Sequence, residues 1–163
     1  MLLTVQCIVC CAIFTLIILP AQYKNPLCMI ASYPPAVRKR VAELPEYKDV
    51  ITEKEKKHMG KKVFGIFFFS GVLAAVAYVS GCRNFAETFF HVFVLFFTVN
   101  IYDMIVLDWG VFCHSQKPRI PGTEDMDKEY KDKLFHVKGA AVGCVLGLIV
   151  GVLSGCIVHF ALL

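Results

Sequence analysis

The sequence predicts an all-α membrane protein, in which four transmembrane helices form an up-down bundle and both termini are extracytoplasmic. Three observations lead to this prediction. The chain of 163 residues is 57% hydrophobic and 18% charged, whereas a soluble domain is nearer to 45–50% apolar. Its apolar residues fall into four long runs, and its basic residues fall almost entirely into two of the loops between them. The length leaves room for a single domain, residues 1–163.

The first three runs are residues 2–21, 63–81 and 85–112. Residues 2–21 are uncharged and long enough to cross about 30 Å of hydrocarbon. They lack the basic start and the small-residue cleavage site of a signal peptide, so we expect a retained helix that ends at Pro20. The second run is rich in Phe, and a short polar turn reverses the chain between the second and third runs.

The fourth run, residues 139–163, has a glycine at every fourth position. These glycines are Gly139, Gly143, Gly147, Gly151 and Gly155. Small residues at this spacing form a groove in which a second helix backbone packs closely in lipid. In water each glycine would cost a helix about 1 kcal/mol. The pattern predicts a glycine zipper that packs against another molecule, or against the first or second helix of the same chain.

Charge predicts the orientation in the membrane. Sixteen of the seventeen Lys and Arg residues lie in the loops 22–62 and 113–138, and only Arg83 lies in the short turn. By the positive-inside rule both loops are cytoplasmic. The sequence therefore predicts a multi-pass protein of a plasma membrane, and its small size is typical of the bacterial cytoplasmic membrane.

The two loops also carry helix signals. Residues 36–44 read as a short amphipathic helix on the membrane surface. Thr52 and Glu55 have capping-box spacing, which predicts the start of a helix that runs into the second span. Thr123 is the expected N-cap of a helix that begins near Glu124 and continues into the fourth span.

Polar residues near the cytoplasmic end of the third span are the main candidates for a catalytic or ligand site. The candidates are Asn100, Asp103, Asp108, His114 and His136. An ionisable residue inside a transmembrane helix is costly, which makes it a functional candidate by default. Either histidine could serve as a general base. In a regular helix Asp108 points about 140° away from Asp103, so we do not expect the two carboxylates to form a close pair.

A structural interpretation of Asp103 stands beside the functional one. At this depth the carboxylate could pair with Lys138, or with Lys61 and Lys62, which begin the neighbouring spans.

A second set of candidates lies near the outer ends of the helices. Glu87, His91, Cys156 and His159 fall at a similar depth and are residue types that bind Zn or Cu. The alternative is that the histidines form hydrogen bonds within the bundle and that the cysteines act as packing residues. Cys7 and Cys10 have the spacing of a thiol redox pair. A transition metal is thus a possible cofactor, and the sequence requires none.

Motifs exclude several function classes. The chain has no Walker loop, no Gly-x-Ser-x-Gly and no His-Glu-x-x-His, and its loops lack the aromatic interleaving of a nucleic-acid site. We expect a membrane protein that acts by binding lipid or protein and by helix-face assembly. Its expected partners are membrane lipids, a second copy of the chain or another membrane protein. The alternatives are a membrane enzyme or transporter that uses the inner polar residues, and metal binding near the outer face.

Overall fold

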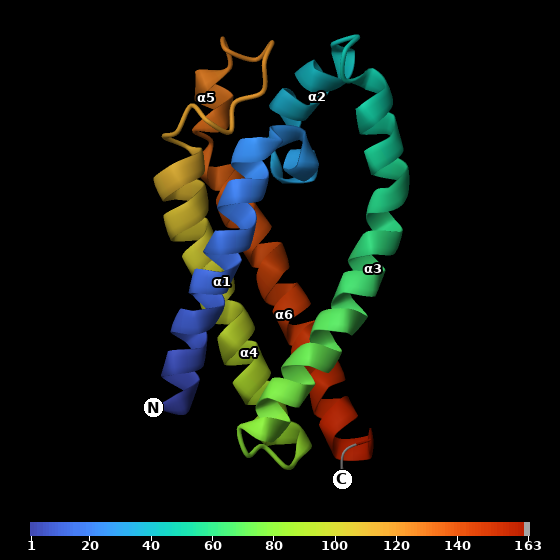
Figure 1. Cartoon of the computed structure of the whole chain (residues 1–163), viewed down its shortest axis with the longest axis vertical. Helices are drawn as coiled ribbons and strands as arrows, with labels where there is room; N and C mark the ends of the chain where they lie inside the picture. Colours follow the sequence, from blue (N-terminus) through green and yellow to red (C-terminus); the bar gives the residue numbers. More distant parts are fainter. Residues whose placement is uncertain (162–163) are drawn as a thin grey trace.

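The computed structural model describes residues 1–161, with side chains described at 1–51, 60 and 62–160. Its elements are α1 (Leu2–Lys24), η1 (Pro26–Ser32), α2 (Pro35–Glu43), α3 (Lys48–Val79), α4 (Phe85–Tyr102), η2 (Asp103–Phe112), α5 (Asp127–Tyr130) and α6 (Lys133–Ala161). Figure 1 shows an elongated molecule in which η1, α2 and α5 gather at one end, which we call the capped end. Both ends of the ribbon and the turn between α3 and α4 lie at the opposite end, the hairpin end (Figure 1).

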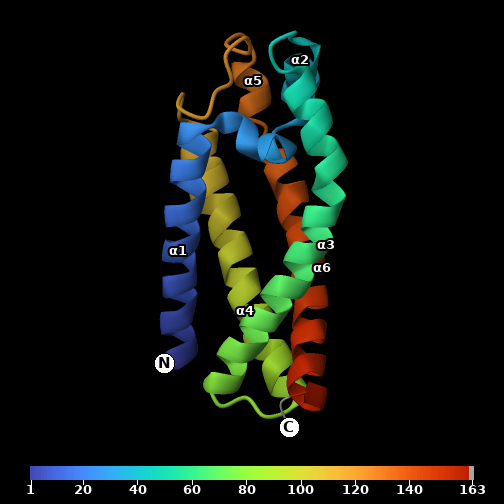
Figure 2. The ribbon, with the colours of Figure 1, turned by 45° about the vertical axis from the view of Figure 1, so that its right-hand side comes forward.

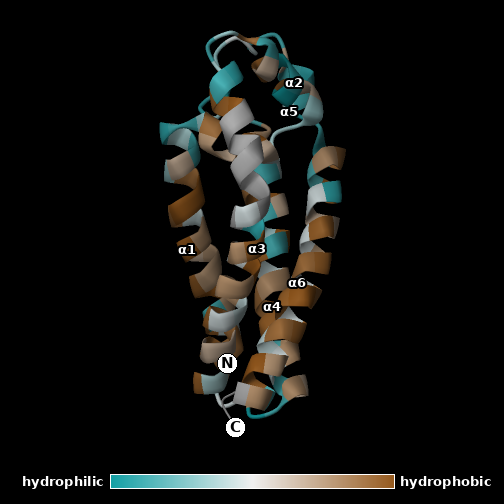
Figure 3. Cartoon of the chain, turned by 90° about the vertical axis from the view of Figure 1, so that its right-hand side faces the viewer, coloured by the Kyte–Doolittle hydropathy of each residue, from teal (hydrophilic) through white to brown (hydrophobic). Residues whose placement is uncertain are grey.

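Four helical segments are long and apolar enough to cross a membrane. They are Leu2–Lys24, Lys62–Val79, Phe85–Phe112 and Asp127–Phe160. The last segment comprises α5 and α6, with residues 131 and 132 between them. Apolar residues dominate the long helices, whereas hydrophilic residues concentrate at the capped end (Figure 3). The prediction of an all-helical protein with four candidate spans is confirmed, and these segments indicate an integral membrane protein.

Two helix ends differ from the predicted ones. The first helix does not end at Pro20 but continues to Lys24, where Asn25 N donates to Ala21 O at 3.1 Å. The helix expected to start at Thr52 begins at Lys48, and Ile51 N already donates to Tyr47 O at 3.0 Å. The third span covers the predicted residues 85–112 as α4 and η2 together. Its start is fixed by the Asn84 side chain, which accepts a hydrogen bond from Glu87 N at 2.9 Å.

The fourth span is not continuous with a helix from Glu124, as the sequence predicted. Thr123 does not cap a helix, because its hydroxyl donates to Ile120 O at 2.6 Å and lies 2.8 Å from the hydroxyl of Tyr130. In this loop only the four residues of α5 are α-helical, and the helical structure is interrupted after Tyr130. A new helix, α6, then starts where Asp132 Oδ1 accepts a hydrogen bond from Phe135 N at 3.2 Å.

The expected amphipathic helix exists as α2, but its apolar face does not lie on the membrane surface. Val37 and Val41 are fully buried in a hydrophobic cluster of the capped end. The cluster also contains Tyr33, Phe112 and Tyr130. The valines are therefore covered by the protein itself, and α2 turns its basic residues outwards.

The glycine face of α6 packs against α4. A Cβ atom at Gly143 would come within 2.1 Å of Asn100 Oδ1, and one at Gly147 would come within 2.8 Å of the Phe96 ring. Gly151 and Gly155 approach Phe89 and Phe85 in the same way, whereas a Cβ at Gly139 would meet nothing within 4 Å. The third span, and not the first or second, occupies this groove.

The other two long helices are attached to the α4–α6 pair through polar contacts. On α3, Ser70 O accepts a hydrogen bond from Ser154 Oγ of α6 at 2.9 Å. On α1, the Thr15 hydroxyl lies 2.7 Å from the hydroxyl of Tyr102 on α4. Figure 2 shows α1 running beside α4 along its length. The α4–α6 pair is thus the centre on which α1 and α3 are placed.

We predict that Gly143→Ala lowers the thermal stability of the protein in mild detergent, whereas Gly139→Ala does not. The added methyl at residue 143 collides with Asn100, while the one at residue 139 enters open space. Overpacking of this kind costs about 1–3 kcal/mol. Thermal unfolding of the purified variants measures the difference. Equal midpoints for the two variants would contradict the packing of α6 on α4.

Candidate functional site

The third span changes its helical geometry where the candidate residues begin. Residues Asp103–Phe112 form a π-helix that continues α4 without a break. In this geometry a backbone N–H bonds the carbonyl five residues back, as Cys113 N does to Asp108 O at 2.9 Å. Residues five apart therefore lie on nearly the same side of the helix. The two carboxylates therefore diverge less than they would in a regular helix, and Asp103 lies within electrostatic reach of Asp108 and of His136.

His136 comes to this place from the second turn of α6. Its Nδ1 lies 2.9 Å from Asp108 Oδ2, and its side chain is 3% exposed, against 30% for Asp108. The edges of two rings, Phe112 and Phe135, meet the imidazole, each with its centroid 5.3 Å away. The buried Nε2 atom has no hydrogen-bond partner among the described residues. We call Asp103, Asp108 and His136 the inner polar site.

Asn100 has a different role from the other candidates. Its Nδ2 donates to Ala140 O at 2.9 Å and lies 3.4 Å from Cys144 Sγ, both on α6. The amide occupies the space left by Gly143. Asn100 thus joins α4 to α6 about one turn from Asp103, on the side of the hairpin end.

His114 is not part of the inner polar site. It is exposed, and its Nδ1 lies 2.7 Å from Trp109 O. Of the five predicted candidates, the structure brings three together, places Asn100 next to them and leaves His114 apart.

No counter-ion holds Asp103 in the part of the chain that the structure describes. The described ion pairs join His136 to Asp108, Arg40 to Asp125, and both Arg119 and Lys131 to Asp127. Lys138, one of the expected partners, is exposed, and the side chain of Lys61 lies outside the described residues. Nearby Lys133 places its Nζ 5.4 Å from the centre of the Trp109 ring. The carboxylate of Asp103 is half-buried and without a hydrogen bond to any described residue.

The four outer candidates are not brought together. Glu87 Oε2 accepts a hydrogen bond from Arg83 N at 2.9 Å, and the exposed ring of His159 packs on Phe160 at 4.6 Å. His91 Nε2 is buried without a partner among the described residues. In that part of the chain no group of three or more His, Cys, Asp or Glu residues is placed to hold a metal ion. The structure therefore adds no support to a metal centre at Glu87, His91, Cys156 and His159.

The thiol redox pair expected of Cys7 and Cys10 on α1 stays a prediction. Cys7 Sγ lies 3.6 Å from Thr98 Oγ1 of α4, and all eight cysteines are free thiols.

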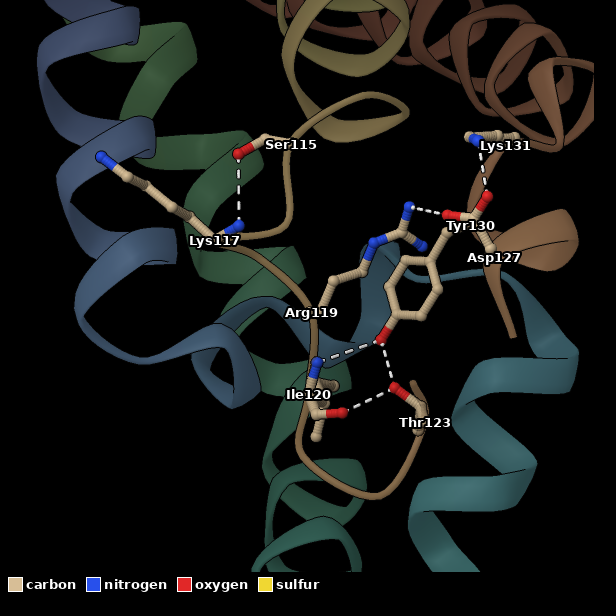
Figure 4. Close-up of polar contacts among 8 residues, drawn as sticks. All are labelled: Ser115, Lys117, Arg119, Ile120, Thr123, Asp127, Tyr130 and Lys131. Carbon is tan, nitrogen blue, oxygen red and sulfur yellow. Dashed lines mark hydrogen bonds and ion pairs between the residues drawn. The ribbon is translucent and has the colours of Figure 1, made fainter. Parts of the chain in front are cut away.

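A polar network closes the capped end above the inner polar site, and sequence reasoning missed it. The Tyr130 hydroxyl accepts a hydrogen bond from Ile120 N at 3.2 Å and pairs with Thr123 Oγ1 (Figure 4). Arg119 lies over the Tyr130 ring at 3.9 Å and pairs with Asp127 at 2.8 Å. These contacts hold the loop 113–138 in a defined conformation. Hydropathy alone shows only that this loop is polar.

Tyr33 joins η1 to the same loop. Its hydroxyl donates to Pro118 O at 2.7 Å, and its ring meets the edge of the Phe112 ring at 5.0 Å. Burial raises the pKa of Tyr33 far above its usual range, so the hydroxyl remains a donor at any physiological pH. Phe112 in turn contacts His136, so the cap and the inner polar site are one packed unit.

Comparison with known protein families, with characterised proteins and with solved structures gives no match for this chain. The residues of the inner polar site are therefore the basis for proposing a function.

We predict that Tyr130→Phe destabilises the capped end. The substitution leaves Ile120 N–H and the Thr123 hydroxyl with one partner fewer in a buried setting, at a cost of about 1–3 kcal/mol. Tyr23→Phe is the matched control, because Tyr23 is half-buried and its hydroxyl makes no hydrogen bond to a described residue. Thermal unfolding in detergent compares the two variants. Equal falls in the unfolding midpoint would contradict a stabilising role of the network.

Proposed function

We propose that this protein is a multi-pass membrane protein whose inner polar site binds the headgroup of a membrane lipid or a small polar molecule. The observation that carries the proposal is the Asp108–His136 pair, with Nδ1 to Oδ2 at 2.9 Å and a buried Nε2 that has no described partner. Asp103 adds a second carboxylate, which forms no ion pair with a described residue. Ionisable groups inside a span are costly, and they often mark a site that binds a substrate or an ion.

The proposed orientation places the capped end in the cytoplasm. Sixteen of the seventeen Lys and Arg residues belong to the loops at this end, as the positive-inside rule requires of a cytoplasmic face. Both termini would then be extracytoplasmic, and the four helices would alternate up and down. The inner polar site would lie at the cytoplasmic edge of the hydrocarbon, where headgroups and soluble molecules both have access. We propose the bacterial plasma membrane as the location.

Acid–base chemistry on the bound ligand is a second candidate function. If Nδ1 of His136 carries the proton that faces Asp108, Nε2 is a lone-pair acceptor. An imidazole oriented by a carboxylate is a suitable general base. A transporter or enzyme would use the same three residues, so both are tested by the same substitutions.

Assembly through the glycine face has less support. Four of the five glycines already face side chains of α4, so a partner helix would have to displace α4. An oligomer of this protein would use another face of the bundle.

We predict that Cys82 and Cys28, each kept as the single cysteine, react with a membrane-impermeant maleimide from opposite sides. Cys82 lies in the turn at the hairpin end and Cys28 in η1 at the capped end. In intact cells Cys82 should be labelled, whereas Cys28 should be labelled only after the membrane is opened. Burial raises the pKa of the Cys82 thiol, so its labelling should accelerate as the pH rises above neutral, because thiolate is the reactive form. Labelling of Cys28 in intact cells would reverse the proposed orientation.

We predict that the wild-type protein, extracted with its surrounding lipid, retains a ligand that Asp103→Asn and His136→Gln lose. Loss of a hydrogen bond to a charged group costs about 1.5–3 kcal/mol, which corresponds to roughly a ten-fold or greater fall in occupancy. Native mass spectrometry measures the bound mass. His114→Gln is the control, since His114 is exposed and outside the site. A wild-type protein without any bound mass, or equal occupancy in all variants, would contradict the proposal.

A further inference from the structure

We infer that the side chain of His114 selects between two conformations of the third span, a π-helical and an α-helical form of residues 103–112. The hydrogen bond of His114 favours the π-helical form, and its loss favours the α-helical one. The inference goes beyond the proposed function. It concerns the backbone of the span, so it is tested without a ligand.

The two forms compete for one backbone carbonyl, that of Trp109. In an α-helix this carbonyl would accept a hydrogen bond from Cys113 N, four residues further on. In the structure Cys113 N donates to Asp108 O instead, at 2.9 Å. The Trp109 carbonyl faces the imidazole of His114, whose Nδ1 lies 2.7 Å away. Because a carbonyl oxygen only accepts, Nδ1 carries the proton and replaces the backbone donor of the α-helical form.

The balance between the two forms is sensitive to this one bond. Helices of the π type are rare and usually last a single turn, whereas this one has 10 residues. The buried atoms Trp109 Nε1 and His136 Nε2 have no partner among the described residues, so the π-helical form leaves polar groups unsatisfied. His114 is exposed, and an ordinary hydrogen bond shifts an equilibrium by roughly two- to ten-fold.

Conversion would rotate and lengthen the end of the span. Its start is fixed, since Asn100 Nδ2 donates to Ala140 O of α6 at 2.9 Å. A π-helical turn takes up about one residue more than an α-helical turn, because its hydrogen bonds reach the fifth residue instead of the fourth. The α-helical form of residues 103–112 therefore makes more turns and is longer by roughly 3 Å.

The rotation would uncover His136, so the switch regulates access to the inner polar site. In the π-helical form the imidazole is 3% exposed, with Asp108 Oδ2 2.9 Å from Nδ1 and the Phe112 ring 5.3 Å away. Both contacts depend on the direction in which the span turns these side chains. Phe112 also meets the Tyr33 ring at 5.0 Å, so conversion would release the capped end as well.

The distance between two spin labels on the third span measures the conversion. Ala86→Cys, in the first turn of α4, and Gln116→Cys, just after the span, are exposed positions for the labels. The native cysteines are replaced by alanine, and double electron–electron resonance is recorded in nanodiscs. In His114→Ala we expect the share of a distance longer by roughly 3 Å to rise two- to ten-fold. His114→Gln keeps a side-chain donor, so it should match the protein with His114.

The thiol of Cys113 provides a second measurement without spin labels. It is 1% exposed at the end of the span. Kept as the single cysteine in detergent, it should react with a maleimide roughly two- to ten-fold faster in His114→Ala. Cys11 of α1, which is 9% exposed, is the matched control and should react at an unchanged rate. Acceleration at both cysteines would show a general loosening of the bundle and would overturn the inference.

Identical distance distributions with His114 and with His114→Ala would also overturn it. So would an equal shift in His114→Gln, because loss of the hydrogen bond would then not be the cause. The proposed function is judged separately by ligand retention. If the wild-type protein retains no ligand while His114→Ala lengthens the span, the proposed function fails and the switch stands. If the ligand is retained and the span does not change, the binding site stands and the switch fails.

Discussion

The close approach of α6 to α4 is the constraint on which the rest of the structure depends. Because Gly143 has no side chain, the Asn100 amide fits against α6 and donates to Ala140 O at 2.9 Å. About two helical turns nearer the capped end, the same packing sets His136 beside Asp108. Separating the two helices at the glycines would therefore also take the imidazole away from its carboxylate. The glycines thus position the residues of the inner polar site without contacting them.

The π-helical segment gives the site its second carboxylate. Its wider turn directs Asp103 and Asp108 to nearly the same side, which a regular helix would not do. At the end of this segment, Phe112 is 3% exposed and contacts both Tyr33 and His136. The cap thereby holds the segment and the imidazole together. The π-helix is rare, and the single π-helical turns found inside α-helices lie frequently at functional sites.

Hydropathy and charge were sufficient to predict the four spans, because length and apolarity are properties of each segment alone. The bounds of the third span were predicted to the residue, whereas the functional roles of Asp103 and His136 stay predictions. The partner of the glycine face was not predictable, because spacing shows that a groove exists and not which helix fills it. The π-helix was missed since a fixed rotation per residue assumes a regular helix. The network of Tyr130, Thr123 and Arg119 depends on tertiary contacts across a loop, which no local pattern encodes.

The polar groups of the spans differ in how they are satisfied, and that difference separates structure from function. Asn100 and Ser154 each donate to a backbone carbonyl of a neighbouring helix, so these donors are hydrogen-bonded within the chain. Thr88 Oγ1 is buried without a described partner, but it is neutral, so its burial costs less than that of a charged group. Asp103 is ionisable, half-buried and unpaired among the described residues, and a second carboxylate lies within its electrostatic reach. A role confined to packing would be filled better by an apolar or amide side chain. Asp103 is for this reason the residue of the spans at which we propose that a ligand binds.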